Sequence, residues 1–484
     1  MTGALLHSRW IRGLLAPGAA SLALVLPILL QKRVQAGDLA SHLYNTWLVL
    51  LVKSGEPLGL EIVPQYSNVL FDWWLEGLWR IGGPVFAEKA AASLAVLVFF
   101  WGAFFLLSRL TGRLAWSSAP LLAMLAYGWI YHQGFFNYYL SCAFGFWAVG
   151  LAAAGGRQTL LGLPLLAAAA AGHLVGASAA AGFAAYLVVL RRASIGKRRW
   201  ILAAAVLALA GVAAAIAWSL PSAWKPARFL HLTGGTAFMA YRGKYAIAAL
   251  IIISYWIWVL LSAGRTNQRL DLSRPAAHLA FLGATGLVLL PTTLHWPGTT
   301  HPLYFIDWRV GLWFTLLLHC WLTTLSPSRA MATVCSGAAA IYFLFLAADW
   351  RVLGRLEQAL HEAVRLAPPG SRVVTSISSI PFRNNPVLHL IDRACIGHCY
   401  SYGNYEPSTF QFRLRVQPGS PVVIDSPKQV TALQEGHYKV QPRDLPLFAV
   451  DLDDSARSFR FRVRPLQPGE VVGLVRVDLP PAWF

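Results

Sequence analysis

Long apolar runs separated by shorter polar connections dominate the chain between residues 14 and 348. A helix needs about 20 predominantly apolar residues to cross a bilayer. The pattern therefore predicts an α-helical polytopic membrane protein with about 11 transmembrane helices, at residues 14–30, 84–108, 114–131, 136–154, 159–172, 174–190, 201–220, 246–263, 276–291, 309–325 and 330–348.

The runs at 159–172 and 174–190 are short for a complete crossing. We count them as two spans because Arg157 and the basic segment 191–199 flank them, and basic connections of this kind are typical of the cytoplasmic side. The chain must then leave and return between them, with a turn near His173.

Two longer polar segments interrupt the apolar pattern, the connection 31–83 and the tail from residue 349. In the connection, apolar positions at helical spacing predict two amphipathic helices in the membrane interface, at Leu39–Val52 and Val69–Ile81. In the tail, a helical pattern precedes short strand-like runs, at Arg351–Leu366, Arg372–Ser376, Pro421–Asp425 and Val471–Val477. We therefore expect a transmembrane domain over residues 1–348 and a small extracytoplasmic α/β domain over residues 349–484.

Composition agrees with a membrane protein, because 56% of the residues are hydrophobic, 13% are charged and the mean hydropathy is +0.52. The formal net charge of +19 does not indicate nucleic-acid binding, since the basic residues form short clusters between apolar runs. Under the positive-inside rule these clusters are cytoplasmic, which places the N-terminus inside. Residues 31–83, 221–245, 292–308 and the tail are then outside, which is the periplasm if the membrane is a bacterial inner membrane.

Asp38 follows the first apolar run, and His42 comes four residues later. If a helix begins near Asp38, the two side chains share one face of it. A carboxylate at the outer membrane surface can take the proton of a substrate hydroxyl or amine that acts as the acceptor in a group transfer. We therefore regard Asp38 and His42 as catalytic candidates. The alternative is that Asp38 only caps the helix that follows.

The expected outer loops contain cations, against the positive-inside bias. Such cations fit a phosphate headgroup, with non-specific attraction to anionic lipids as the alternative; they are Lys225, Arg228, Arg242, Lys244 and Arg309. Asp307 stands beside Arg309 as a structural partner or as part of the same binding site. Three further binding candidates lie at expected outer turns, where polar groups usually face a cavity or the protein interior; they are His132, Asn137 and His173. The alternative is that they only form turns or anchor the chain at the membrane interface.

Other polar residues have plainer interpretations. Asp72, Glu76 and Arg80 follow one another at intervals of one helical turn, which favours a solvated ladder of charges. Cys395 and Cys399 form either a disulfide, if the tail is extracytoplasmic, or two free thiols. Their spacing lacks the paired pattern of a zinc site, so we predict no metal site.

On these features the chain resembles the GT-C superfamily of membrane glycosyltransferases, such as the dolichyl-phosphate-mannose protein mannosyltransferases and the bacterial aminoarabinose transferases. The resemblance rests on an N-in first span, Asp38 early in the first outer loop, two interfacial helices and an outer C-terminal domain. It implies a polyprenyl-phosphate sugar as donor substrate, inversion at the anomeric carbon, and Asp38 near the acceptor. Many members have an acidic pair at this point, whereas Leu39 follows Asp38 here, which leaves open the use of a divalent cation and the class of acceptor.

Part of the tail, Ile391–Gly397 with Ser401–Pro407, resembles that of bacterial membrane proteins of this type. Its aromatic, Asn and Glu side chains either bind sugar or order a loop. Two other functions stay open. A transporter or lipid flippase is expected to show repeats and charges at mid-membrane depth, and a non-catalytic scaffold is expected to lack a cavity joining Asp38 to the outer cations. The absence of a P-loop argues against an ATP-driven pump.

Overall fold

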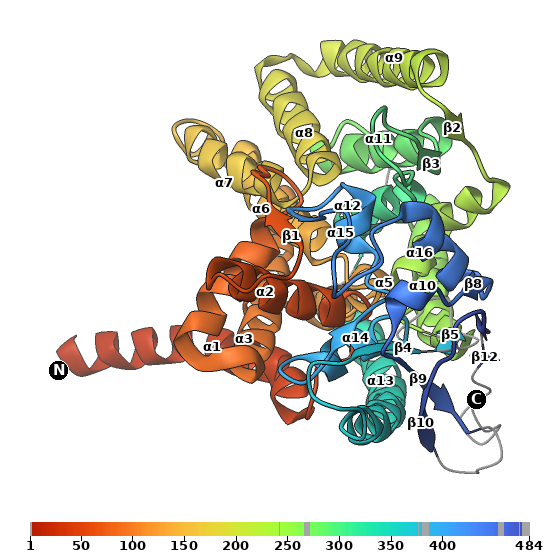
Figure 1. Ribbon diagram of the computed structural model, residues 1–484. Coiled ribbons are helices and arrows are strands. Elements are labelled where there is room, and N and C mark those ends of the chain that lie inside the picture. The colour runs from red at the N-terminus through yellow and green to blue at the C-terminus, as the bar shows by residue number, and fades with distance from the viewer. Residues whose placement is uncertain are drawn as a thin grey trace.

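Helices make up most of the protein, and the strands are short (Figure 1). The computed structural model describes residues 2–241, 243–265, 272–326, 328–375, 377–379, 387–453, 459–473 and 475–476. The α-helices are α1 (Thr2–Leu30), α2 (Leu39–Lys53), α3 (Leu70–Thr111), α4 (Ala119–Ala126), α5 (Trp129–Gln133), α6 (Phe136–Ala154), α7 (Gln158–Gly172), α8 (Leu174–Arg192), α9 (Ile195–Ser219), α10 (Ala246–Arg265), α11 (Pro275–Leu289), α12 (Ile306–Thr323), α13 (Ser328–Val364), α14 (Leu390–Cys395), α15 (Glu406–Thr409) and α16 (Pro427–Gln434).

Short 3₁₀ helices and strands complete the described chain. The 3₁₀ helices are η1 (Ala115–Ser118), η2 (Pro226–Thr233), η3 (Gly235–Phe238), η4 (Gly243–Tyr245) and η5 (Pro442–Asp444). The strands are β1 (Leu60–Ile62), β2 (Ser222–Ala223), β3 (Thr293–Leu294), β4 (Arg372–Thr375), β5 (Ile377–Ser379), β6 (Tyr400–Ser401), β7 (Leu414–Val416), β8 (Tyr438–Lys439), β9 (Leu447–Leu452), β10 (Phe461–Pro465), β11 (Val471–Val472) and β12 (Val475–Arg476).

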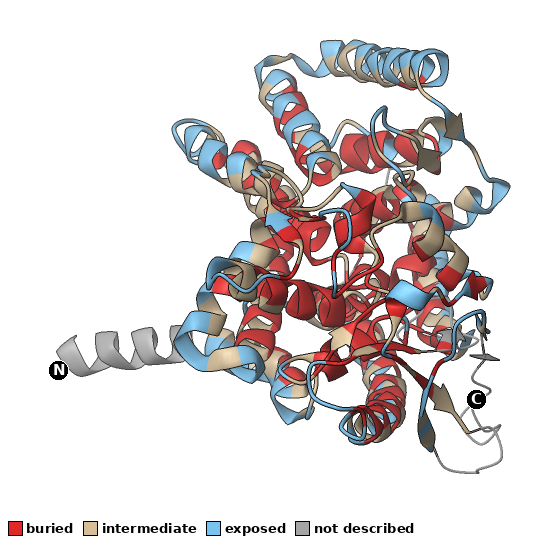
Figure 2. Ribbon diagram, viewed as in Figure 1, coloured by how far each residue is buried: buried red, intermediate tan, exposed pale blue. Residues whose placement is uncertain are grey.

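Among the described residues, five helices are long and apolar enough to cross a membrane. They are Leu70–Thr111, Leu174–Arg192, Ile195–Ser219, Gly243–Gly264 and Ser328–Val364. Each of the other expected ranges contains helix, but some are short, and the third is divided between α4 and α5 at Tyr127 and Gly128. The prediction of a mostly helical protein with apolar helices of membrane-spanning length is thus confirmed, while the expected 11 spans are not. The surface of α9 is mostly exposed (Figure 2), as expected of a lipid-facing helix.

The first amphipathic helix, α2, is buried rather than lying in the membrane interface, so that prediction is wrong. Ten of its residues, on all sides of the helix, are buried. The C-terminal region covers it, because the Ser401 backbone N–H donates to the Tyr44 hydroxyl at 2.9 Å and Trp47 stacks on Tyr400 at 5.7 Å. In addition, β1 pairs antiparallel with β7, which joins the first loop to the C-terminal region.

The second amphipathic helix forms as predicted and continues into the next apolar run as the single helix α3. A kink at Gly83 separates the two parts, where the backbone has φ 76° and ψ −174°. Pro84 follows, and proline cannot donate to the preceding helical turn. The kink lets the two parts of this single helix run in different directions.

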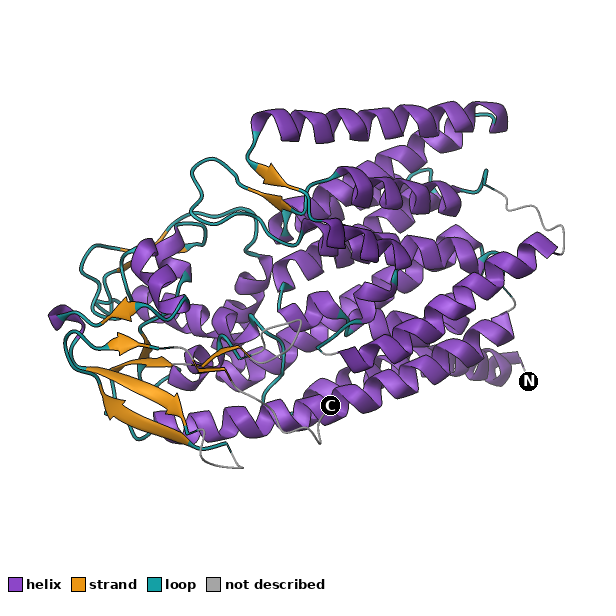
Figure 3. Ribbon diagram, turned by 90° about the vertical axis from the view of Figure 1, so that its right-hand side faces the viewer, coloured by secondary structure: helices purple, strands orange, loops and turns teal. Residues whose placement is uncertain are grey.

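The strands gather at one end of the long helices (Figure 3). The largest sheet has the order β10-β9-β4-β6, in which β4 runs parallel to both β9 and β6. The predicted strand Pro421–Asp425 is wrong, and this segment is a loop. Three successive side chains, Val422, Val423 and Ile424, are buried, and the N–H of Ile424 donates to the carbonyl of Tyr402 instead of joining a ladder.

A buried ion cluster attaches this end to the long helices. Arg393 in α14 donates to Glu357 in α13 at 2.6 and 2.8 Å and to Glu88 in α3 at 2.7 Å. It also donates to the carbonyl of Val34 at 3.0 Å, and Gln35 donates to Glu357 at 2.7 Å. The cluster therefore fixes the position of α14 relative to the chain that leads to Asp38.

Candidate functional site

Asp38 lies at the start of α2 with a carboxylate that helix capping does not use. Its backbone N–H donates to the carbonyl of Gln133 at 3.2 Å, and that of Gly37 donates to His132 at 2.9 Å. Gly134, at φ 86°, packs so closely that a Cβ there would lie 2.1 Å from the Asp38 nitrogen. The side chain makes no capping hydrogen bond and is 25% exposed. The alternative that Asp38 serves only as a cap is therefore not supported.

A histidine–carboxylate pair from the C-terminal region faces Asp38. Nε2 of His389 lies 3.7 Å from Oδ1 of Asp38, and Nδ1 of the same ring lies 2.8 Å from Oδ2 of Asp392. Asp392 also accepts from the Ser401 hydroxyl at 2.5 Å. Although burial opposes protonation of His389, the neighbouring carboxylates of Asp392 and Asp38 raise its pKa.

A second histidine–carboxylate pair comes from α2 and the start of α3. Nδ1 of His42 lies 2.8 Å from Oδ1 of Asp72, and the Asn137 amide donates to Oδ2 of Asp72 at 2.9 Å. Burial opposes charging of His42, but the Asp72 carboxylate, with help from Glu406 and Asp38, raises its pKa to about 9. His42 is therefore a charged group beside Asp38 at neutral pH.

These contacts correct the expected charge ladder on α3. Glu76 does pair with Arg80 at 2.7 Å. However, Glu76 is also bound by Lys53 and Arg413, whose nitrogens lie 2.5 and 2.9 Å away, and its side chain is 11% exposed. Asp72 instead points to His42 and Asn137. The prediction of a solvated ladder is therefore wrong. The chain folds back over both carboxylates, and Asp72 pairs with His42 rather than with a neighbour on α3.

Glu406 adds a third acidic group to this polar region. Its carboxylate accepts from the Ser41 hydroxyl at 2.6 Å. Burial raises its pKa to about 7, although the charge of His42 opposes the rise. Burial also raises the pKa of Asp38, against the charges of His389, His42 and Arg309. We call the set Asp38, His42, Asp72, His389, Asp392 and Glu406 the Asp38 site.

Among the described cations that the sequence analysis singled out, Arg309 is the one whose positive charge opposes the rise in the pKa of Asp38. It is 7% exposed and lies over the rings of Phe135 and Tyr138, with its carbon 4.6 and 5.5 Å from their centroids. Its Nε has no hydrogen-bond partner. His173 contacts the same Tyr138 ring at 5.5 Å. Arg309 is thus a desolvated cation with unused donor capacity at Nε.

The other predicted binding residues lie elsewhere or have other partners. Lys244 pairs with Asp349 at 2.7 Å, and Asp307 lies 3.3 Å from His231. Lys225 is exposed, and the Arg228 guanidinium lies over Phe229 at 4.9 Å. The ring of His132 is fully buried against Tyr241 and Trp350, although its backbone supports the Asp38 loop. Arg242 lies outside the described residues.

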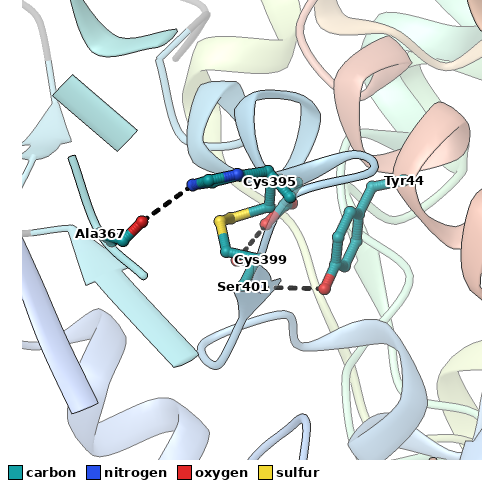
Figure 4. Close-up of a disulfide and its surroundings, with 7 residues drawn as sticks. Tyr44, Ala367, Cys395, Cys399 and Ser401 are labelled. Carbon is teal, nitrogen blue, oxygen red and sulfur yellow. Dashed lines mark hydrogen bonds between the residues drawn. A yellow bond between two sulfur atoms is a disulfide. The ribbon is translucent and has the colours of Figure 1, made fainter. Parts of the chain in front are cut away.

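The two tail cysteines form a disulfide, which decides between the alternatives left open by the sequence. Cys395 and Cys399 are joined across a Cα–Cα separation of 4.6 Å (Figure 4). The bridge closes the turn after α14, and the same view shows Ser401 bonded to Tyr44. Nε2 of His398, within this turn, lies 3.0 Å from the carbonyl oxygen of Ala367. It therefore holds α14 beside the strand that covers α2.

The acidic groups of the Asp38 site do not form a metal centre. Within the described ranges, no group of three or more His, Cys, Asp and Glu side chains is arranged to hold a metal ion. Asp72 and Asp392 are each bound to a histidine. We derive no chemical step through a divalent cation.

Sequence reasoning did not place the C-terminal residues His389, Asp392 and Glu406 beside Asp38, although Glu406 belongs to the tail segment considered for sugar binding. The i,i+3 spacing of His389 and Asp392 is a signal that a short helix would place them together. Nothing local to either residue indicates that they meet Asp38, 350 or more positions earlier in the chain. No model of a protein family, no curated protein and no solved structure matches this chain.

Proposed function

We propose that the protein is an integral membrane glycosyltransferase that moves a sugar from a polyprenyl-phosphate donor to an extracytoplasmic acceptor. The observation that carries the proposal is the Asp38 carboxylate, which is partly exposed, free of capping and flanked by two histidine–carboxylate pairs. A base is most effective when its pKa lies near the working pH. The raised pKa of Asp38 moves it in that direction.

In the proposed reaction, Asp38 takes the proton of an acceptor hydroxyl or amine. The acceptor atom forms a bond to C1 of the sugar while the bond from C1 to the phosphate oxygen breaks, with inversion at C1. The electron pair of that bond leaves on the polyprenyl phosphate. Arg309 is the cation best placed to offset this charge, since its guanidinium is desolvated and its Nε lacks a partner.

The two histidines have separate tasks in this scheme. His389, oriented by Asp392, presents Nε2 to Asp38. When His389 is protonated, its positive charge stabilises the Asp38 carboxylate. His42, held by Asp72 and Asn137, keeps a positive charge beside the carboxylate. Both groups stabilise the ionised form of Asp38, which is the form that accepts a proton.

The test is donor consumption by the full-length protein in lipid nanodiscs. Polyprenyl-phosphate mannose and polyprenyl-phosphate aminoarabinose are supplied with a bacterial envelope extract as acceptor, and released polyprenyl phosphate is measured by mass spectrometry. Asp38→Asn keeps the side-chain shape and is expected to lower the rate by about 10²–10⁴-fold. Asp425→Asn, which removes a carboxylate paired with Arg443 far along the chain, is the matched control and should keep the rate.

Two results would contradict the proposal. One is a wild-type protein that releases no polyprenyl phosphate from either donor. The other is an Asp38→Asn variant with the full wild-type rate. Movement of the intact donor between the two leaflets, without release of polyprenyl phosphate, would favour a transport function.

A further inference from the structure

A large apolar groove lies between α1 and α13, apart from the Asp38 site. Its volume is about 1050 Å³, and α3 and α4 contribute to its lining. Apolar side chains make up most of its wall, including Leu26, Leu30, Phe100, Tyr127, Phe343 and Trp350. Leu26 and Leu30 are 44% and 76% exposed, so α1 leaves apolar surface uncovered along the groove. We call this feature the α1–α13 groove.

One end of the α1–α13 groove is strongly cationic. Four basic side chains line it, and Glu362 is the acidic side chain in the lining; the four are Lys32, Arg33, Arg351 and Arg355. Lys32 and Arg33 both donate to the neutral amide oxygen of Gln358, at 2.6 and 3.1 Å. Because this acceptor is neutral, it does not offset the charges of Lys32 and Arg33, and basic side chains outnumber acidic ones at the cationic end.

The groove and the Asp38 site are separated by the buried ion cluster. Between Arg33 and Asp38 the chain passes through Gln35, which bonds to Glu357, and Glu357 is bound in turn by Arg393. Trp350 lines the groove on one side and contacts His132 with ring centroids 5.9 Å apart. The buried ion cluster would therefore lie between the headgroup of a lipid in the groove and the Asp38 carboxylate.

We propose that the α1–α13 groove binds one anionic phospholipid of the surrounding bilayer, with its phosphate on the cationic end and an acyl chain along the apolar wall. The charge of the mouth is complementary to a phosphate, and Arg and Lys bind phosphate through charge-assisted hydrogen bonds. The apolar wall can pack against an acyl chain through van der Waals contacts, as apolar surfaces do within a bilayer. The inference is independent of sugar transfer, since it uses none of the residues of the Asp38 site.

Native mass spectrometry of the full-length protein tests this site. The protein is equilibrated with vesicles of phosphatidylglycerol and phosphatidylcholine in equal amounts, and the lipid retained after removal of the bulk is identified. The wild type should retain phosphatidylglycerol in preference. Each basic residue near an anionic headgroup contributes about 1 kcal/mol, so Arg351→Gln with Arg355→Gln should lower that preference by about thirtyfold.

Two further variants keep the test specific. Arg192→Gln with Lys197→Gln removes two exposed charges from another surface and should leave the preference unchanged. Gly354 lines the groove and has open space around the position of a Cβ, so Gly354→Trp should extend a ring into the groove and lower retention.

Three outcomes would overturn the inference. Equal retention of the two lipids by the wild type would show that headgroup charge is not recognised. Unchanged retention in Gly354→Trp would place the lipid elsewhere. Displacement of phosphatidylglycerol by an equimolar amount of polyprenyl phosphate would assign the groove to that lipid instead.

Discussion

Replacement of Arg393 by methionine is the perturbation whose effect follows most directly from the structure. The guanidinium makes three hydrogen bonds to two carboxylates and one to the Val34 carbonyl. The side chains of Glu357 and Glu88 are 0% and 6% exposed. Methionine fills similar space but carries no charge, so Arg393→Met leaves two buried carboxylates without their cation.

The expected cost is large for a single substitution. Breaking a buried ion pair by removing one partner costs about 3–5 kcal/mol, because the remaining charge stays desolvated. Because the entropy of unfolding grows with chain length, Arg393→Met should lower the midpoint of thermal unfolding by about 3–5 °C. Neutralising the two carboxylates in the same chain, with Glu88→Gln and Glu357→Gln, should restore much of this loss, since amides tolerate burial when hydrogen-bonded.

The measurement is thermal unfolding of the full-length protein in detergent, followed by tryptophan fluorescence. Arg462→Met is the matched control, because Arg462 is 72% exposed and its pair with Asp453 should contribute about 0–1 kcal/mol. If Arg393→Met changed the midpoint no more than Arg462→Met, the buried cluster would not hold the C-terminal region to the long helices. Failure of the triple substitution to restore stability would show that the charges themselves are not the cause.

Three other predictions follow from single contacts. The folded-state pKa of His42 is raised to about 9, so its pairing with Asp72 stabilises the protein fully below about pH 6.5 and loses this effect as the pH rises through 9. His42→Gln should therefore flatten the fall in unfolding temperature between these pH values. An unchanged slope would refute the assignment. Cys395 and Cys399 should react with iodoacetamide only after reduction, as peptide mass spectrometry can show. Asn137→Leu should cost about 1–3 kcal/mol in chemical unfolding, because Asp72 and the Phe71 N–H lose a partner.

The helical ranges were predictable because a run of apolar residues bounded by polar ones is a local property. The kink at Gly83 and Pro84 and the helix that begins near Asp38 depend on adjacent residues as well. The position of Asp38 was also predictable as a polar residue just beyond an apolar run. By contrast, local pattern gave the wrong environment for α2, since amphipathic spacing does not reveal whether lipid or protein covers the apolar side.

The sequence by itself determined a mostly helical protein with long apolar helices and a strand-containing C-terminal region, because hydropathy and periodicity act over one or two helical turns. Only the tertiary structure decided that His389 faces Asp38, that Arg393 joins α14 to α3 and α13, and that a cationic groove opens between α1 and α13. Each of these features joins segments far apart in the chain. Their formation depends on long-range packing and on the desolvation of charges, which no local pattern of residues encodes.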